Sequence, residues 1–443
     1  MEKKIVISPG MTVIRSVSLI AFLLLGLQQV LPAQNIIARQ SHEDGVYKKN
    51  EKIKATVFLN GSTDDSLLVT IWKNFSKQKV QKKLKYSGDT MVFFNDKLPY
   101  PGSVIFEIHT KTDSASIGSI VQPDRFTPGT KRPKDFDEYW QEEKRALRQL
   151  PMQVKAVPLK ETGNGYVCQN VEINCTGPKP ARGYFAKPGS AKPGSLPIVL
   201  FVHAAGIISA SWVRSNPENA VRYAKMGRGA LSFDLNAHGM LNGQPDSYYD
   251  SLQQNDLKNY PYIGLGSKKD FYFRGMYLRL MRTLDFLTSQ PEWDGKRIMV
   301  IGESQGGGQA LAAAGLDHRV TAVIATVPAM CDWGGTLAGR KGGWPDPFAK
   351  TQYDRQTLLS TLPYFDVAHI LKGSKATLVV EIGLIDTTCP AAGIFAAVNQ
   401  AAGRKILFTD TYRGHHASPP AYREVWQKTV NEPKNAFIDD YLK

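Results

Sequence analysis

A serine lies in the middle of a glycine-rich motif, Gly302-Glu303-Ser304-Gln305-Gly306. The aliphatic residues 297–301 before it predict a strand, and the small residues 307–315 after it predict a helix that packs closely. A sharp turn from strand to helix exposes the central serine, and glycine at 302 and 306 removes side chains that would collide in that turn. This context is typical of a nucleophile elbow, so we expect Ser304 to attack a carbonyl carbon.

A serine hydroxyl becomes a good nucleophile when an imidazole takes its proton and a carboxylate fixes the tautomer of that imidazole. On such a scaffold the chain order is serine, acid, histidine. His415 and His416 are the histidines far enough along the chain, and their spacing leaves both open as the general base. An isolated earlier histidine such as His238 is expected to be a hydrogen-bonded polar residue instead.

The acid should lie just past a late strand, which is where Asp386 occurs. Asp332 comes one strand earlier, and Asp410 is so near the histidines in sequence that a good approach to them is harder. We therefore expect Asp386 to orient the imidazole, while Asp332 and Asp410 belong to turns or to the surface.

The tetrahedral intermediate of acyl transfer carries an oxyanion, which needs two preorganised N–H donors. The first should be the backbone N–H of Gln305, directly after the nucleophile. The second should come from the loop after an early strand, where Phe201-Val-His-Ala-Ala-Gly206 offers small residues that let the backbone approach a substrate.

Short aliphatic runs alternate with helical patterns over the chain that carries these residues. One helix should span Phe273–Leu287, where apolar residues recur on one helical face. Strands that alternate with helices predict a mostly parallel sheet covered on both faces, as in the α/β-hydrolase fold. The predicted strands are 198–202, 230–233, 298–301, 322–325, 377–382 and 406–409.

The chain before this scaffold has a different character. Over 34–122 apolar residues recur at period two between turn-forming clusters, so we expect a small all-β sandwich of immunoglobulin-like type. A helix over 134–150, acidic early and basic late, should open the catalytic domain, 123–443. Residues 1–33 have the pattern of a signal peptide, with a basic start, an uncharged run over 17–31 and small residues near 33. This pattern predicts export to the periplasm or the extracellular space.

The composition of the 443 residues is that of an ordinary globular protein, with a formal charge of +15. Residues 1–33 hold three Lys/Arg and one Glu, so their removal leaves 15 − 2 = +13. The densest basic run, Lys77–Lys85, reads as the solvated face of a strand, and we expect no nucleic-acid partner and no membrane span in the mature protein. Four cysteines are too few for a disulfide-built scaffold, their pairing is left undetermined, and no metal or cofactor motif is present.

Several linked motifs resemble the acetyl xylan esterase and cephalosporin C deacetylase family, carbohydrate esterase family seven. They include the run Phe271–Leu287, the elbow from Arg297 to Ala314, Val327-Pro-Ala-Met-Cys-Asp-Trp333 and the opening helix Asp135–Trp140. The resemblance covers roughly 124–443. It implies a serine deacetylase of short acetylated sugars, with Ser304, Asp386 and His415 as its catalytic residues and no cofactor.

The resemblance also implies that Ala205 donates the second oxyanion N–H, although the family usually has a tyrosine there. Two further departures are Asn236-Ala-His-Gly-Met240, in place of an Arg-Gly-Gln segment, and residues 34–122, which compact members lack. Those members form hexamers, so a homo-oligomer is compatible with the pattern, unless the added domain blocks the contacts. Aromatic residues such as Trp333 and Trp344 could stack on a sugar.

Two other functions compete with deacetylation of xylo-oligosaccharides or related acetylated sugars. A peptidase or a broad, lipase-like esterase could use the same fold, because fold alone does not decide the substrate. From another class, the chain could be an inactive carbohydrate-binding protein whose β-sandwich binds the sugar. The expected order of serine, acid and histidine along the chain argues against an inactive binding protein.

Overall fold

The computed structural model describes residues 36–59, 66–75, 79–86, 88–159, 165–207 and 213–443. The signal peptide predicted at 1–33 lies outside the described residues. None of the helices in the described ranges combines the length and apolar character that crossing a bilayer requires.

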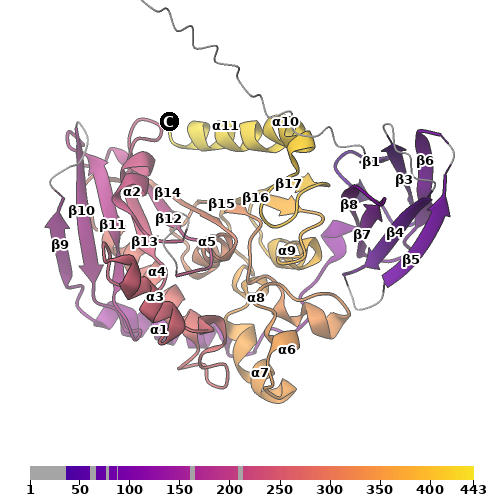
Figure 1. Ribbon diagram of the computed structural model, residues 1–443. Helices are drawn as coiled ribbons and strands as arrows, with labels where there is room; N and C mark the ends of the chain where they lie inside the picture. The colour runs from indigo at the N-terminus through magenta and orange to yellow at the C-terminus, as the bar shows by residue number, and fades with distance from the viewer. Residues whose placement is uncertain (1–35, 60–65, 76–78, 87, 160–164, 208–212) are drawn as a thin grey trace, which may run out of the picture. The chain divides into compact units, whose positions relative to one another are not determined.

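A nine-stranded sheet with the order β17-β16-β15-β14-β12-β13-β11-β10-β9 forms the centre of the larger domain (Figure 1). All neighbours from β13 to β17 pair in parallel, whereas β11, β10 and β9 join by antiparallel pairing. The mostly parallel α/β-hydrolase sheet is therefore confirmed, and each predicted strand overlaps an observed one. The strands are β9 (Val154–Pro158), β10 (Tyr166–Ile173), β11 (Ala181–Pro188), β12 (Leu196–Val202), β13 (Leu231–Asn236), β14 (Trp293–Glu303), β15 (Ala322–Thr326), β16 (Thr377–Gly383) and β17 (Lys405–Asp410).

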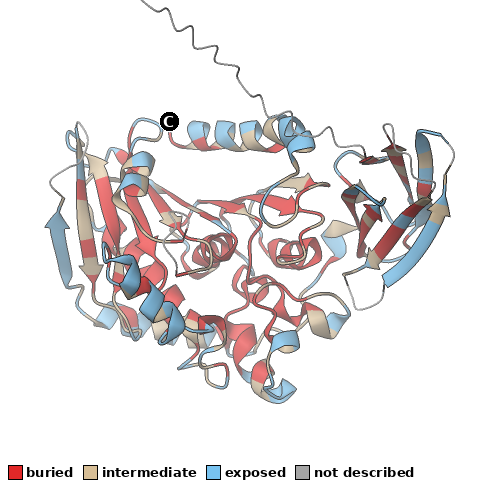
Figure 2. Ribbon diagram, in the orientation of Figure 1, coloured by how far each residue is buried: buried red, intermediate tan, exposed pale blue. Residues whose placement is uncertain are grey.

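Helices cover both faces of the central strands, which explains why these strands read as continuous apolar runs. Successive side chains of a strand point to opposite faces, so Val199 and Ile198 of β12 belong to different apolar clusters. Helices α2 (Pro217–Ala224) and α11 (Glu432–Tyr441) pack on the face of Val199, and the opposite face is covered by α4 (Tyr272–Thr288), α5 (Gln305–Leu316) and α9 (Ala391–Val398). Figure 2 shows α5 and α9 buried along their length.

Helix α4 is buried on nearly all sides, which differs from the single apolar face that its sequence predicts. Two arginines on the predicted polar side of the helix account for the difference. Their guanidinium groups donate hydrogen bonds to backbone carbonyl oxygens, which allows the arginines to be buried inside the domain. Arg279 donates to Ala237 O at 2.8 Å, and Arg282 donates to Leu147 O at 2.6 Å.

The remaining helices are shorter or lie at the edges of the sheet. They are α1 (Phe136–Gln149), which matches the predicted opening helix, α3 (Asp246–Gln254), α6 (Pro347–Lys350), α7 (Arg355–Thr361), α8 (Val367–Ile370) and α10 (Arg423–Trp426). Short segments of 3₁₀-helix are η1 (Pro123–Arg125), η2 (Tyr260–Tyr262), η3 (Trp333–Ala338), η4 (Leu362–Tyr364) and η5 (Pro420–Tyr422), and η6 (Gln427–Asn431) is a short π-helix.

A smaller domain precedes this scaffold and contains two sheets with the orders β1-β3-β6 and β2-β8-β7-β4-β5. Alternate residues of β3 are buried in its core, as the period-two pattern predicts. All strand pairs are antiparallel except β2 with β8, so the small all-β domain is confirmed, while its immunoglobulin-like type stays a prediction. The strands are β1 (Ile36–Gln40), β2 (Val46–Tyr47), β3 (Lys52–Leu59), β4 (Ser66–Lys73), β5 (Lys79–Lys85), β6 (Thr90–Lys97), β7 (Gly102–His109) and β8 (Ser114–Val121).

The lysine run forms β5 at the edge of the five-stranded sheet, where every residue except Leu84 is exposed. The solvated reading of this run is confirmed for its described part, 79–85. Charged side chains on an edge strand also discourage pairing with another chain.

All four cysteines are free thiols. Cys168, Cys331 and Cys389 are buried, and burial raises the pKa of each thiol, to about 11 for Cys168. Disulfide bonds therefore do not hold this fold together, and its stability comes from the packed cores of the two domains.

Candidate active site

The chain turns from strand to helix at Ser304, between the last residue of β14 and the first residue of α5. The backbone of Ser304 has φ 55° and ψ −119°, a conformation that residues other than glycine rarely adopt. A Cβ atom on Gly302 would lie 2.3 Å from the carbonyl carbon of Gly306, and one on Gly306 would lie 2.2 Å from Val202 O. The glycines at 302 and 306 are thus required by the close approach of backbone segments, and the structure has the predicted elbow.

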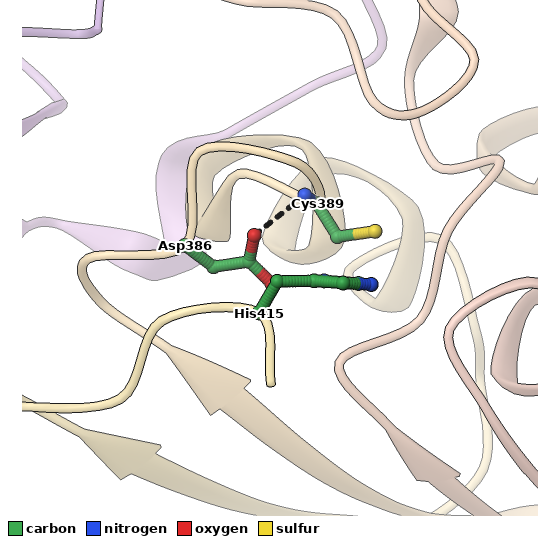
Figure 3. Close-up of side chains that lie close together, drawn as sticks. All are labelled: Asp386, Cys389 and His415. Carbon is green, nitrogen blue, oxygen red and sulfur yellow. Dashed lines mark hydrogen bonds and ion pairs between the residues drawn. The ribbon is translucent and has the colours of Figure 1, made fainter. Parts of the chain in front are cut away.

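Ser304, His415 and Asp386 form a hydrogen-bonded chain at this turn. The distance from Ser304 Oγ to His415 Nε2 is 2.9 Å, and the distance from His415 Nδ1 to Asp386 Oδ2 is also 2.9 Å. Figure 3 shows the carboxylate of Asp386 directed at the ring of His415. The chain can pass a proton from the hydroxyl to the imidazole while the carboxylate holds the ring in one tautomer.

The buried carboxylate of Asp386 is held by the turn that follows β16. Its Oδ1 accepts a hydrogen bond from the backbone N–H group of Thr388 at 2.7 Å. It accepts a second one from the backbone N–H group of Cys389 at 2.8 Å, which Figure 3 shows. These two hydrogen bonds hold the carboxylate in place, so that its other oxygen, Oδ2, meets the ring of His415.

The other candidate acids make contacts of their own. Asp332 accepts from Gly129 N at 2.6 Å and pairs with Arg340 at 2.5 Å. Asp410 accepts from Tyr412 N at 2.8 Å and from Ser418 Oγ at 2.5 Å. Both aspartates therefore have structural roles.

The two adjacent histidines point in different directions. The ring of His416 is exposed and stands edge to face against that of His415, with 5.4 Å between ring centroids. Ser304 Oγ is hydrogen-bonded to His415, which is the histidine that the family resemblance implies, whereas the chain order alone left both candidates open.

Gln305 lies at the first position of α5, where backbone N–H groups have no partner within the helix. Its side chain is buried and accepts a hydrogen bond from Tyr260 Oη at 2.5 Å. Ala205 lines the same pocket as Ser304, on the loop that follows β12. The structure thus brings the backbone segments of both predicted oxyanion donors close to Ser304.

His238 is hydrogen-bonded through both ring nitrogens, as expected for a polar residue without a catalytic role. Its Nε2 donates to Gly206 O at 3.1 Å, and its Nδ1 accepts from Tyr272 Oη at 2.6 Å. Burial lowers the pKa of His238 to about 3, so the ring is neutral. This side chain ties the loop that carries Ala205 to the segment 236–240, a contact that the sequence reading missed because no local pattern links the two segments.

A pocket of about 720 Å³ opens at Ser304. Asn219, Arg222 and Tyr223 of α2 contribute to its wall, and sequence reasoning had no signal for them because α2 reaches the site only through tertiary packing. The lining also includes Phe201, Ala204, Ala205, Ile301, Gly302, Glu303, Thr326, Trp344, His415 and His416.

The structure separates the two tryptophans that were considered for sugar stacking. Trp344 lines the pocket. Trp333 is 0% exposed, packs against Phe271 and Phe273, and donates from its ring nitrogen to Trp344 O at 3.1 Å. The expectation that Trp333 contacts substrate is therefore wrong in this structure, because its ring belongs to the core beneath the site.

Three side chains near Ser304 carry atoms that can bind a metal ion, namely the sulfur of Cys389, a carboxylate oxygen of Asp386 and a ring nitrogen of His415 (Figure 3). These three atoms all lie within 4.8 Å of one another. Two of these groups are already hydrogen-bonded to one another. Burial also raises the pKa of the Cys389 thiol, which keeps it protonated and weakens it as a ligand.

Comparison with known proteins agrees with this arrangement. A family model described as acetyl xylan esterase (AXE1) matches residues 121–431. The acetyl esterase Axe7A of Xylanibacter ruminicola is 32% identical over 311 residues, which are 69% of this chain and 69% of that protein.

Two solved structures of acetyl xylan esterases are also similar. The enzyme from Paenibacillus sp. R4 is 26% identical with a TM-score of 0.56, and the match covers 72% of this chain and 99% of that enzyme. Acetyl xylan esterase 1 from Thermoanaerobacterium sp. JW/SL YS485 shares the fold at 21% identity, with a TM-score of 0.55 over 70% of this chain and 97% of that enzyme. The resemblance seen in the sequence motifs is thus confirmed, and this carboxylic ester hydrolase belongs to the acetyl xylan esterase family.

Proposed function

We propose that the enzyme removes O-acetyl groups from xylo-oligosaccharides or related acetylated sugars, with Ser304 as the nucleophile. The observation that carries this proposal is the hydrogen-bonded chain from Ser304 through His415 to Asp386, whose first two members line the pocket. The similar proteins are an acetyl esterase and an acetyl xylan esterase, which supports the choice of an acetyl substrate.

In the first half of the reaction Ser304 Oγ attacks the acetyl carbonyl carbon while His415 Nε2 takes the hydroxyl proton. The backbone N–H groups of Gln305 and Ala205 stabilise the resulting oxyanion. The intermediate collapses as His415 gives its proton to the departing sugar oxygen, which leaves Ser304 acetylated. His415 then takes a proton from a water molecule, which attacks the acetyl carbonyl carbon. The bond from that carbon to Ser304 Oγ breaks as His415 returns the proton to Oγ, which releases acetate and restores the free hydroxyl.

The walls of the pocket suit a polar alcohol better than a long acyl chain. Glu303, Arg222 and Asn219 bring charged and amide groups to the lining, and Trp344 and Tyr223 bring aromatic rings. The hydroxyl groups of a sugar can hydrogen-bond with the charged and amide groups, and its ring can stack on the aromatic rings. An extended hydrocarbon chain would instead desolvate the charged groups without compensation.

We therefore expect 4-nitrophenyl acetate to be hydrolysed with a kcat/KM at least about 100-fold above that of the octanoate, because burying those polar groups costs about 1–3 kcal/mol each. The two esters share a leaving group, so their rates compare the acyl chains alone. Equal or inverted rates would favour a broad esterase. A higher kcat/KM on a peptide than on acetylated xylo-oligosaccharides would favour a peptidase.

We also propose that residues 1–33 direct export and are then removed, on the basis of their basic start and apolar run. Expression of the full chain in a bacterium with a general secretion pathway should yield an extracytoplasmic protein whose first residue is close to Gln34. Full-length protein retained in the cytoplasm would contradict this part of the proposal.

A further inference from the structure

Arg413 is a nearly buried arginine, 5% exposed, in the turn between β17 and His415. The guanidinium group carries several N–H donors in one plane and can therefore join several segments at fixed angles. Its partners come from three separate parts of the chain, and each of these parts leads directly into Ser304, Asp386 or His415.

The side chain of Arg413 contacts the residues next to the proposed nucleophile and the proposed base. Its Nη2 lies 3.4 Å from Glu303 Oε1, and Glu303 immediately precedes Ser304. The same nitrogen lies 3.4 Å from the carbonyl oxygen of His416, which immediately follows His415. One guanidinium nitrogen thus contacts both the elbow that carries Ser304 and the turn that carries His415.

The backbone of Arg413 contacts the segment that carries the proposed acid. Its carbonyl oxygen accepts a hydrogen bond from Ile385 N at 3.2 Å, and Ile385 immediately precedes Asp386. The approach is close, because a Cβ atom on Gly383 would lie 2.5 Å from that carbonyl oxygen.

The guanidinium is held in place by Glu381, a fully buried carboxylate on β16. Arg413 Nη1 donates to Glu381 Oε1 at 2.5 Å. Glu381 has further partners in Trp426, at 2.7 Å, and Lys434, at 2.7 Å. The carboxylate would therefore keep a cation beside it if Arg413 were replaced, so a variant at 413 does not leave an unpaired buried charge.

We propose that Arg413 is a positioning residue that holds the segments of Ser304, His415 and Asp386 in register with one another. This inference rests on the proposed function, because it assigns a role relative to those three residues. The chemistry needs the hydroxyl, imidazole and carboxylate at hydrogen-bonding distances. A misplacement of about 1 Å at such a site costs about 100-fold in rate.

Replacing Arg413 by lysine or by glutamine tests this role. Lysine keeps the charge beside Glu381 but cannot reach several partners in one plane, so we expect kcat on 4-nitrophenyl acetate to fall about tenfold. Glutamine also loses the charge, and we expect a fall of about 100-fold. In both variants KM should stay within about twofold of the wild-type value, because Arg413 does not line the pocket at Ser304.

Arg274→Gln is the matched control, since Arg274 makes a bidentate ion pair with Glu143, at 2.7 and 2.8 Å, that links α4 to α1. Rates are divided by the concentration of sites that a fluorophosphonate labels, so a loss of folded protein does not count as a loss of kcat. The control should keep wild-type kcat per labelled site. If the glutamine variant does not accumulate as folded protein, the lysine variant decides the question.

Wild-type kcat per labelled site in the Arg413 variants would overturn the inference, as would an equal fall in the Arg274 control. Ser304→Ala, assayed in parallel, separates this failure from that of the proposed function. If Ser304→Ala is inactive and the Arg413 variants are fully active, only the positioning role is wrong. If Ser304→Ala stays active, the proposed function itself is wrong.

Discussion

Replacing Ser304 by alanine is expected to lower kcat for acetyl ester hydrolysis by about 10⁴-fold or more, because only oxyanion and binding contributions remain without the nucleophile. The fold should be unaffected. The hydroxyl hydrogen-bonds to His415 and makes no helix-capping bond, and alanine has the same backbone restrictions at φ 55° as serine. The measurement is kcat on 4-nitrophenyl acetate, together with the thermal unfolding midpoint.

Ser360→Ala is a suitable control, since the Ser360 hydroxyl is exposed and donates to Thr357 O at 2.7 Å on α7. It should retain wild-type activity. A Ser304→Ala protein that folds and keeps more than a tenth of the wild-type kcat would contradict the assignment of the nucleophile.

The second large effect concerns the two adjacent histidines. His415→Ala should lower kcat by about 10²–10⁴-fold, because Ser304 would lose its general base. His416→Ala should cost about tenfold or less, since its exposed ring lines the pocket but does not contact Ser304 Oγ, and its backbone carbonyl, which Arg413 contacts, is unchanged.

Steady-state kinetics of the two variants on one substrate give this comparison directly. Each variant serves as the control for the other, because both remove an imidazole from the same turn. A larger loss in His416→Ala would transfer the role of general base to His416, and equal severe losses would contradict the assignment of His415.

The elbow could be predicted from the sequence because its determinants are local. A strand, a glycine-flanked serine and a helix of small residues follow one another directly, and the clashes that glycine avoids at 302 and 306 arise from that arrangement. The position of Asp386 followed from the order of the strands, which the alternation of apolar runs reveals.

The choice of histidine and the roles of the aromatic residues depend on tertiary structure. His415 and His416 are adjacent in sequence, and only the path of the backbone after β17 decides which ring meets Ser304. Trp333 and Trp344 have the same side chain, yet Trp333 fills the core while Trp344 reaches the pocket.

Buried charges were the least predictable feature. Glu381 lies between the apolar residues Val380 and Ile382 of β16, and the cations that contact it, Arg413 and Lys434, come from distant segments. Sequence periodicity reports which face of an element is apolar, but it does not report which charged groups meet inside the domain.

The central claim is that Ser304 carries the acetyl group during turnover, and the most direct measurement is mass spectrometry of enzyme quenched with acid during rapid hydrolysis of an acetyl ester. The claim predicts that one acetyl group is added to the peptide that contains Ser304 and that this adduct is missing in Ser304→Ala. An acetyl group on a different residue, or a burst of released alcohol with no acetylated peptide at all, would contradict it.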